Sequence, residues 1–197
     1  MHLRRSIVAL FSILFVAGFL SARAQAVPSA YAQRFTINVG VMGSAFQPDY
    51  AGGGVAHTSP NRLYGPGAYV DVKLTRYLQF EAEARWLRMN PYLDIREDNY
   101  QIGPRLPIEK LRFKRATPYA KFLVGYNRMN FELNGGYGHY ADIAYGGGVD
   151  VKLTKKISLR AIDLEYQQWL GWPNIPGSPN STFSPYGGSV GVSYKVF

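Results

Sequence analysis

Cysteine is absent from this 197-residue chain, and only three histidines occur in it. The lack of cysteine excludes disulfide scaffolds, Cys-ligated zinc or iron–sulfur centres and cysteine nucleophiles. So few histidines also argue against a multi-histidine metal site. Charged residues make up only 18% of the chain, whereas hydrophobic residues make up 47%, which is the composition of a folded protein rather than a disordered one. The sequence predicts no catalytic, cofactor-binding or metal-ligating set and no cofactor.

Residues 1–24 have the pattern of a cleavable export signal. Two arginines precede fifteen uncharged, mostly apolar residues, and an Ala-x-Ala pattern follows. This pattern predicts a signal peptide with cleavage after Ala24 or Ala26. Fifteen residues are fewer than the roughly 20 that a membrane-spanning helix needs, so a membrane anchor is the less favoured alternative. Loss of three arginines with the signal lowers the formal net charge from +9 to +6 and leaves a short N-terminal segment, 25–34.

Residues 35–197 form the main predicted domain, in which apolar and polar residues alternate with a period of two. Successive side chains of a strand point to opposite sides, so the alternation predicts strands with one apolar and one polar face. We predict eight strands, over residues 35–42, 68–74, 78–86, 99–106, 117–128, 141–153, 157–168 and 185–197. The alternation shifts by one residue at Ala161 and Ile162, which predicts a β-bulge. Pro104 cannot donate to the ladder, so the fourth strand is expected to be short or distorted.

The connections between these strands differ in length according to the rim on which they lie. The hexapeptide Val-Asp-Val-Lys-Leu-Thr occurs at 70–75 and at 149–154, each time before a short basic turn, which predicts one hairpin used twice. A moderate connection spans 107–116. The longer connections fall on the other rim, at 47–66, 90–98, 130–140 and 170–184. Short turns on one rim and long loops on the other are typical of outer-membrane β-barrels.

In a membrane barrel the apolar face points outward to lipid and the polar face fills the interior. Eight strands leave an interior just wide enough for side chains, which predicts a filled barrel rather than a general diffusion porin. We expect the interior charges to balance, because unpaired buried charges are costly. The predicted interior network is Asp71, Lys73, Glu81, Glu83, Arg85, Arg105, Lys121, Asp142, Asp150, Lys152, Arg160, Asp163, Glu165 and Lys195. A soluble lipocalin-like barrel, with its apolar face inward around a ligand, is the alternative.

Charge is divided unequally between the two rims. The short-turn rim carries seven bases and one acid, whereas the long loops, which include Arg96, Glu97 and Asp98, carry two bases and five acids. A basic rim suits anionic lipid headgroups better than nucleic acid. At the long-loop rim, Arg88 and Arg128 each stand two residues after an outward aromatic side chain. That position predicts contacts with the phosphates of lipopolysaccharide. The alternative is that both arginines are solvated residues at the ends of loops.

A lipid A-modifying acyl transferase or deacylase is the alternative function. Such an enzyme needs a nucleophile or a base near the outer rim. His57 and Ser59 are predicted in the first long loop and His139 in the third. Polar residues of this kind are common in loops, so a structural or surface-interaction role is favoured over an enzyme.

Residues 30–197 resemble the outer membrane protein A-like β-barrel domain family. The resemblance rests on the export signal, the eight alternating strands, Ile-Gly-Pro-Arg at 102–105, Thr-Pro-Tyr-Ala at 117–120 and a final strand that ends at Phe197. It implies an all-β, antiparallel, up-and-down transmembrane barrel in a Gram-negative outer membrane, monomeric, with phospholipid, lipopolysaccharide and the barrel assembly machinery as partners. Tyr194 and Phe197 resemble the C-terminal assembly signal, although Lys195 departs from the usual pattern.

Overall fold

The structure is a computed structural model, and it describes residues 36–47, 62–88, 96–131, 136–171 and 183–197. The predicted signal peptide, its cleavage site and the segment 25–34 lie outside the described residues. His57 and Ser59 of the first predicted loop also lie outside them.

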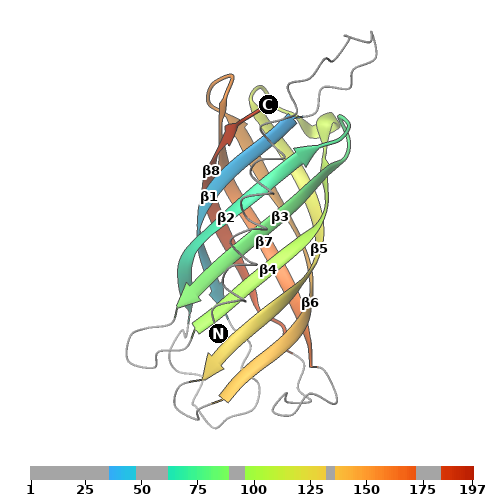
Figure 1. Cartoon of the computed structure of the whole chain (residues 1–197). Coiled ribbons are helices and arrows are strands. Elements are labelled where there is room, and N and C mark those ends of the chain that lie inside the picture. The colour runs from blue at the N-terminus through green and yellow to red at the C-terminus, as the bar shows by residue number, and fades with distance from the viewer. Residues whose placement is uncertain (1–35, 48–61, 89–95, 132–135, 172–182) are drawn as a thin grey trace, which may run out of the picture. The chain divides into compact units, whose positions relative to one another are not determined.

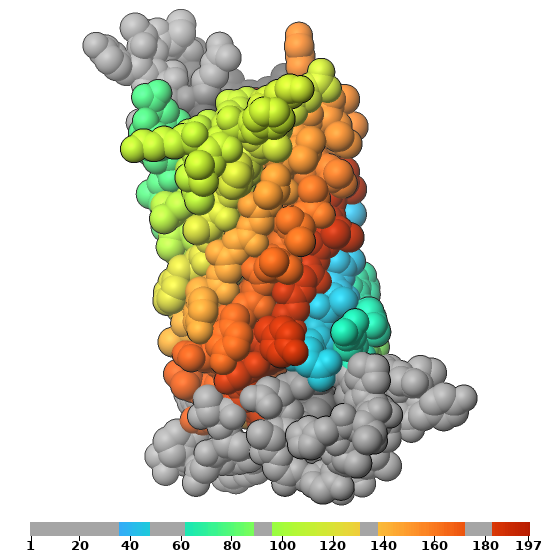
Figure 2. All heavy atoms as spheres, turned by 180° about the vertical axis from the view of Figure 1, so that it is seen from behind, coloured from blue at the N-terminus to red at the C-terminus, as the bar shows by residue number. Residues whose placement is uncertain are grey.

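Eight antiparallel strands close into a barrel in which each strand pairs with the next in sequence (Figure 1). The last strand returns to the first, and the two lie side by side as the red and blue bands of Figure 2. The strands are β1 (Thr36–Gln47), β2 (Leu63–Lys73), β3 (Gln79–Arg88), β4 (Arg96–Pro107), β5 (Ala116–Phe131), β6 (Gly136–Lys152), β7 (Ile157–Gly171) and β8 (Tyr186–Lys195). The predicted eight-stranded up-and-down barrel is confirmed.

Most strands extend further toward the long-loop rim than the alternation predicts. The pairing of β5 with β6 continues to Phe131 and Gly136, so the predicted connection at 130–140 is wrong and His139 lies in a strand. Arg96, Glu97 and Asp98 belong to β4 and not to a loop, because Arg96 pairs with Arg88 of β3. Ladder hydrogen bonds join backbone groups, and they continue where glycine and polar residues interrupt the side-chain pattern.

Two predicted irregularities are present. The register between β7 and β8 shifts between Arg160 and Asp163, which confirms the bulge at Ala161 and Ile162. β4 runs through Pro104, which pairs with β3. On the other side the β4–β5 ladder is interrupted between Ile102 and Arg105, as expected for a residue without an N–H group. The fourth strand is therefore locally distorted but not short.

The repeated hexapeptide forms the same turn twice at the short-turn rim. In the β2–β3 turn the Leu78 N–H donates to Thr75 Oγ1 over 3.0 Å. In the β6–β7 turn the Ile157 N–H donates to Thr154 Oγ1 over 2.9 Å. The third connection on this rim carries a short 3-10 helix, η1 (Glu109–Leu111). No helix among the described residues is long and apolar enough to cross a membrane.

Large apolar side chains cover the outside of the barrel. Val41, Ile102 and Val190 are each about 60% exposed, and each lies in the middle part of its strand. A folded protein in water rarely exposes an apolar belt on every strand, whereas a membrane barrel presents such a belt to lipid. The apolar face therefore points outward.

Candidate functional site

A continuous network of buried ion pairs fills the middle of the barrel. Its centre is Lys121, which points inward from β5. Its Nζ atom lies 2.7 Å from Asp163, 2.8 Å from Glu165, 3.3 Å from Glu83 and 3.4 Å from Glu81. These carboxylates reach the same point because alternate residues of β3 and β7 face the interior.

Arginines extend this network toward both ends of the barrel. Arg85 makes two parallel hydrogen bonds of 3.0 Å to the carboxylate of Glu165 and lies 2.8 Å from Glu83. Arg160 bonds to both oxygens of Glu81, over 3.0 and 2.7 Å. Both arginines are fully buried. Paired bonds between a guanidinium and a carboxylate fix geometry as well as charge, so these side chains are held in place.

Two buried tyrosines cover the guanidinium groups on the side of the short-turn rim. Arg160 lies 3.7 Å from the ring centre of Tyr69, and Arg105 lies 3.6 Å from that of Tyr119. Arg105 also bonds to Asp150 over 2.6 Å. Neither tyrosine belongs to the interior network predicted from the sequence, although the inward phase of their strands contains both. These cation–π contacts help to offset the cost of burying the two arginines.

Three of the carboxylates lie close enough together to share a cation. Ligand oxygens of Glu81, Glu83 and Asp163 are within 4.8 Å of one another. The ammonium group of Lys121 lies among them, in the place that a metal ion would take. The protein therefore supplies the counter-charge of this cluster from its own chain.

The predicted balance of seven acids and seven bases is wrong for the buried interior that the structure describes. Seven acids are buried against four bases. The acids are Asp71, Glu81, Glu83, Glu97, Asp142, Asp163 and Glu165, and the bases are Arg85, Arg105, Lys121 and Arg160. Lys152 and Lys195 are exposed and Lys73 is half-buried, because each lies at a strand end where its side chain reaches water. Asp150 is also half-buried.

A layer of amides separates the ionic network from the long-loop end. Gln101 donates a hydrogen bond from its side-chain amide to Asp142, and Asn99 donates to Gln167 over 3.3 Å. Gln167 accepts a further bond of 2.7 Å from the indole N–H of Trp169. The inward phase of β7 runs from Asp163 through Gln167 to Trp169, so continuing the alternation would have placed these residues correctly.

Apolar side chains fill the interior at the long-loop end. Met129, Tyr140 and Trp169 are buried and pack against Phe183. The ring centres of Tyr140 and Trp169 lie 5.4 Å apart. The interior therefore changes along the barrel axis from charged to amide to apolar, and packed side chains occupy each level.

The lipid-facing side of the long-loop rim carries a group of basic residues. Arg88, which is about half-exposed, lies 3.3 Å from Asp98. Asp98 pairs in register with Arg128, and Arg96 pairs with Arg88. Three arginines on adjacent strands thus surround one acid. We call Arg88, Arg96 and Arg128 the rim arginines.

His139 lies beside the rim arginines and contacts an aromatic residue. Its backbone pairs with that of Arg128. Its ring stacks on Tyr126 with the ring centres 5.8 Å apart, and its Nδ1 atom shares a hydrogen bond with the Tyr126 hydroxyl. The histidine is therefore held on the outer surface of the barrel wall.

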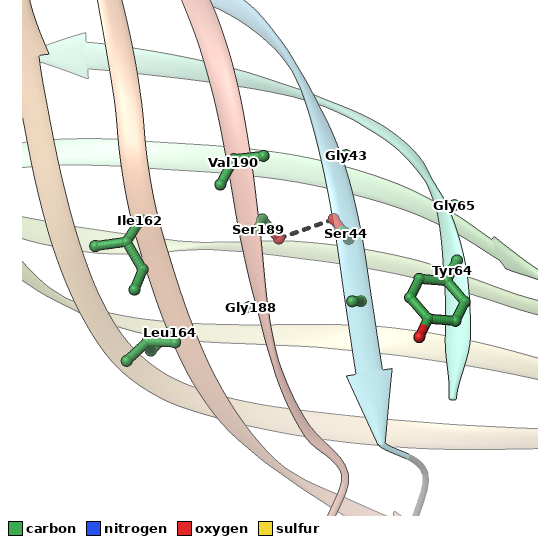
Figure 3. Close-up of a pocket in the computed structure, with 10 residues that line it drawn as sticks. Gly43, Ser44, Tyr64, Gly65, Ile162, Leu164, Gly188, Ser189 and Val190 are labelled. Atoms are coloured by element: carbon green, nitrogen blue, oxygen red, sulfur yellow. Dashed lines mark hydrogen bonds between the residues drawn. The ribbon is translucent and has the colours of Figure 1, made fainter. Parts of the chain in front are cut away.

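A hollow of about 550 Å³ interrupts the apolar belt where the last strands meet the first two (Figure 3). Small residues form its floor, and Gly43 has no atom within 4 Å of the place where a Cβ would lie. Ile162 and Leu164 bound it on β7, and Tyr64 bounds it on β2. Because Tyr64 pairs in register with Arg88, the hollow lies next to the rim arginines.

A model of the outer membrane protein β-barrel domain family matches residues 12–195. The chain belongs to this family. Neisserial surface protein A has a similar structure, with a TM-score of 0.57 and 13% identity over 81% of this chain and 96% of that protein. OprG from Pseudomonas aeruginosa gives a TM-score of 0.53 and 11% identity over 82% of this chain and 95% of that protein. These likenesses show the fold. No curated protein sequence matches the chain.

Membership of the outer-membrane barrel family gives the barrel its orientation. Short turns of such barrels face the periplasm, so the rim with η1 and the C-terminus is periplasmic. The Val196 N–H donates to the Ile37 carbonyl over 2.8 Å, which continues the pairing one residue beyond β8. Tyr194 is half-exposed and Phe197 is 70% exposed. Their role as an assembly signal stays a prediction.

Proposed function

We propose that this chain is a monomeric outer-membrane protein whose interior is closed to solutes and whose role is structural or in surface interaction. The observation that carries the proposal is the set of fully buried ion pairs around Lys121, flanked by packed amide and apolar layers. To pass, a solute would have to break several charge-assisted hydrogen bonds. Breaking each of them costs more free energy than breaking a hydrogen bond between neutral groups.

Planar-bilayer recording tests the closed interior. Purified, folded protein is expected to give no stable ohmic current under conditions in which a general diffusion porin, added as a positive control, conducts. Folding is verified beforehand by a shift in gel mobility on boiling. Large, stable conductance steps from the monomer would contradict the proposal and would show that the network moves aside.

The same proposal places the protein among anionic lipids of the outer leaflet, with the rim arginines as the headgroup contacts. Arginines next to interfacial aromatics such as Trp86 and Tyr126 are well placed to reach phosphate groups. Arg88 lies 3.3 Å from Asp98 and still exposes nearly half of its side chain. Lipopolysaccharide supplies the phosphates on this side of the membrane.

The hollow beside Tyr64 is the proposed binding site for one acyl chain of the same lipid. It is apolar and lies within the lipid-facing belt. A second copy of the protein fits less well, because a symmetric dimer puts the same patch on both subunits and would face one hollow with another. An acyl chain is flexible and narrow enough to fill a groove between side chains.

Co-purification of lipopolysaccharide tests both contacts. Arg88→Gln with Arg128→Gln, and separately Gly43→Leu, are each expected to lower the amount of bound lipid without loss of the folded form on gels. Lys110→Gln with Lys114→Gln removes the same charge from the periplasmic rim and serves as the control. Unchanged lipid content in the test variants would leave the rim arginines as ordinary solvated residues.

The proposal assigns no catalysis to the barrel. In the alternative, His57 and Ser59 would act on lipid A, with His139 as a further candidate. His139 is bonded to the Tyr126 hydroxyl on the barrel wall. Mass spectrometry of lipid A from cells with and without the protein distinguishes the two functions, since an acyl transferase or deacylase changes the number of acyl chains.

A further inference from the structure

The periplasmic mouth of the barrel forms a second hollow, separate from the rim arginines. It has a volume of about 240 Å³, and inward side chains from the strand ends line it together with the turns. Register places these inward residues at one level around the mouth. The pairs are Lys73 with Thr36, Lys195 with Asn38, and Lys152 with Ser158. Arg105 and Tyr119, which are buried, lie deeper in the same hollow.

The residues that line this mouth carry more positive charge than their own acidic side chains neutralise. Of its bases, Arg105 is paired with Asp150 and Arg112 lies 3.6 Å from Glu109. The remaining lining bases are Lys73, Lys152, Lys155, Lys156 and Lys195. Among the residues that the structure describes, these five lysines make no ion pair. Several like charges around one hollow attract a multivalent anion, because each ammonium group adds to the same local potential.

The chain itself does not supply this anion from the segment that leads into β1. Residues 25–35 contain no Asp or Glu and include Arg34. Headgroups of the surrounding bilayer are also poorly placed, because Lys73 and Lys152 belong to the inward phase of their strands. Their neighbours Val72 and Val151 belong to the outward phase. Both observations favour a soluble occupant from the periplasmic side.

We propose that the periplasmic mouth binds a small soluble anion with two or more phosphate groups. Lysine is a compact charge on a flexible stem that suits phosphate oxygens from several directions. Hydroxyl groups of Thr36, Thr117 and Ser158 stand among the lysines and can donate further hydrogen bonds. The volume of the hollow fits a diphosphate or triphosphate group rather than a folded partner.

Calorimetric titration of the folded protein in phosphatidylcholine nanodiscs tests this site, with pyrophosphate and tripolyphosphate as probes. The test variant is Lys73→Gln, Lys152→Gln and Lys195→Gln together. The matched control, Arg76→Gln with Lys110→Gln and Lys114→Gln, removes the same charge from the same rim outside the hollow. We expect the test variant to weaken tripolyphosphate binding at least about tenfold and the control less than about twofold, since nearby charges dominate a screened interaction.

Further results decide the proposal. Replacing the same three lysines by arginine should preserve binding, and the gel shift on boiling should show that every variant is folded. Equal weakening in the test and control variants would place the anion in the general field of the rim and overturn the site, as would no binding by the unaltered protein. Loss of tripolyphosphate binding in nanodiscs that contain phosphatidylglycerol would assign the mouth to lipid headgroups and overturn the soluble ligand.

Discussion

Replacing Lys121 by methionine should destabilise the folded barrel more than any other single change to its lysines. Lys121 is fully buried, and its ammonium group lies within 3.4 Å of four carboxylates. Methionine keeps most of the volume and removes the charge. Glu81 and Glu165 retain arginine partners, whereas Asp163 loses its contact at 2.7 Å and keeps only cations at 3.6 and 3.7 Å.

The expected magnitude follows from this loss of a partner. Breaking one side of a buried ion pair costs about 3–5 kcal/mol, because the remaining charge stays buried without compensation. The acids of this interior already outnumber its bases, so no spare cation is available among the buried residues that the structure describes. We therefore expect a loss near the upper end of that range.

Reversible urea unfolding in lipid vesicles, followed by gel mobility without boiling, measures this free energy. A second variant, Lys121→Met with Asp163→Asn, removes one charge of each sign and should recover a large part of the loss. Tyr119 donates to Asp163 over 2.9 Å and can donate equally to an asparagine carbonyl. Lys110→Met, at an exposed position, is the control. A loss below about 1 kcal/mol for Lys121→Met would refute the reasoning, since surface pairs are worth that little.

Two other predictions concern the barrel wall. Val124 lies in the middle of β5 and points to lipid, so Val124→Arg should lower the free energy of unfolding by about 2–4 kcal/mol. Val151 lies one residue from the end of β6, so Val151→Arg should lower it by only about 0–1 kcal/mol. Unfolding in lipid vesicles measures both changes. On β1, a Cβ at Gly40 would lie 2.3 Å from the buried ring of Tyr69, so Gly40→Ala should destabilise by about 1–3 kcal/mol, whereas Gly43→Ala meets open space and should be neutral. Equal losses of stability for Val124→Arg and Val151→Arg would contradict the assigned depths in the membrane. Equal losses for Gly40→Ala and Gly43→Ala would contradict the assigned faces of β1.

Alternation in the sequence predicts the barrel because a period of two is a property of every strand in it. The bulge in β7 could be predicted for the same reason, because it changes the phase of the alternation at Ala161 and Ile162. The level of a residue along the barrel axis is different, because it depends on the stagger between strands. Lys152 and Glu81 share the inward phase, yet one reaches water and the other is fully buried. The charge balance could not be predicted without that stagger.

Strand ends were the least predictable part of the fold and of the site. Gly136 to Tyr140 carry no regular alternation, so the sequence indicated a loop where backbone pairing continues. For the same reason the sequence did not predict that Arg96 is one of the rim arginines or that Glu97 lies in the interior. Residues beyond the regular pattern are positioned by the neighbouring strand, and the sequence of one strand does not contain that information.

Glu97 should respond to substitution in the opposite direction from Lys121. It is fully buried, and its register neighbours on β3 and β5 are Leu87 and Met129, which are also fully buried. Neither of its carboxyl oxygens has a hydrogen-bond partner among the residues that the structure describes. Burying a polar group without a partner costs about 1–3 kcal/mol, and more if the group is charged. Glu97→Leu removes that cost and extends the apolar layer, so it should stabilise the barrel by about 1–3 kcal/mol in the same unfolding assay. Glu97→Gln keeps the shape and an unpaired polar group, and should gain less than Glu97→Leu. Destabilisation by both variants would show instead that the carboxyl group bonds to a part of the protein that approaches it from the long-loop rim.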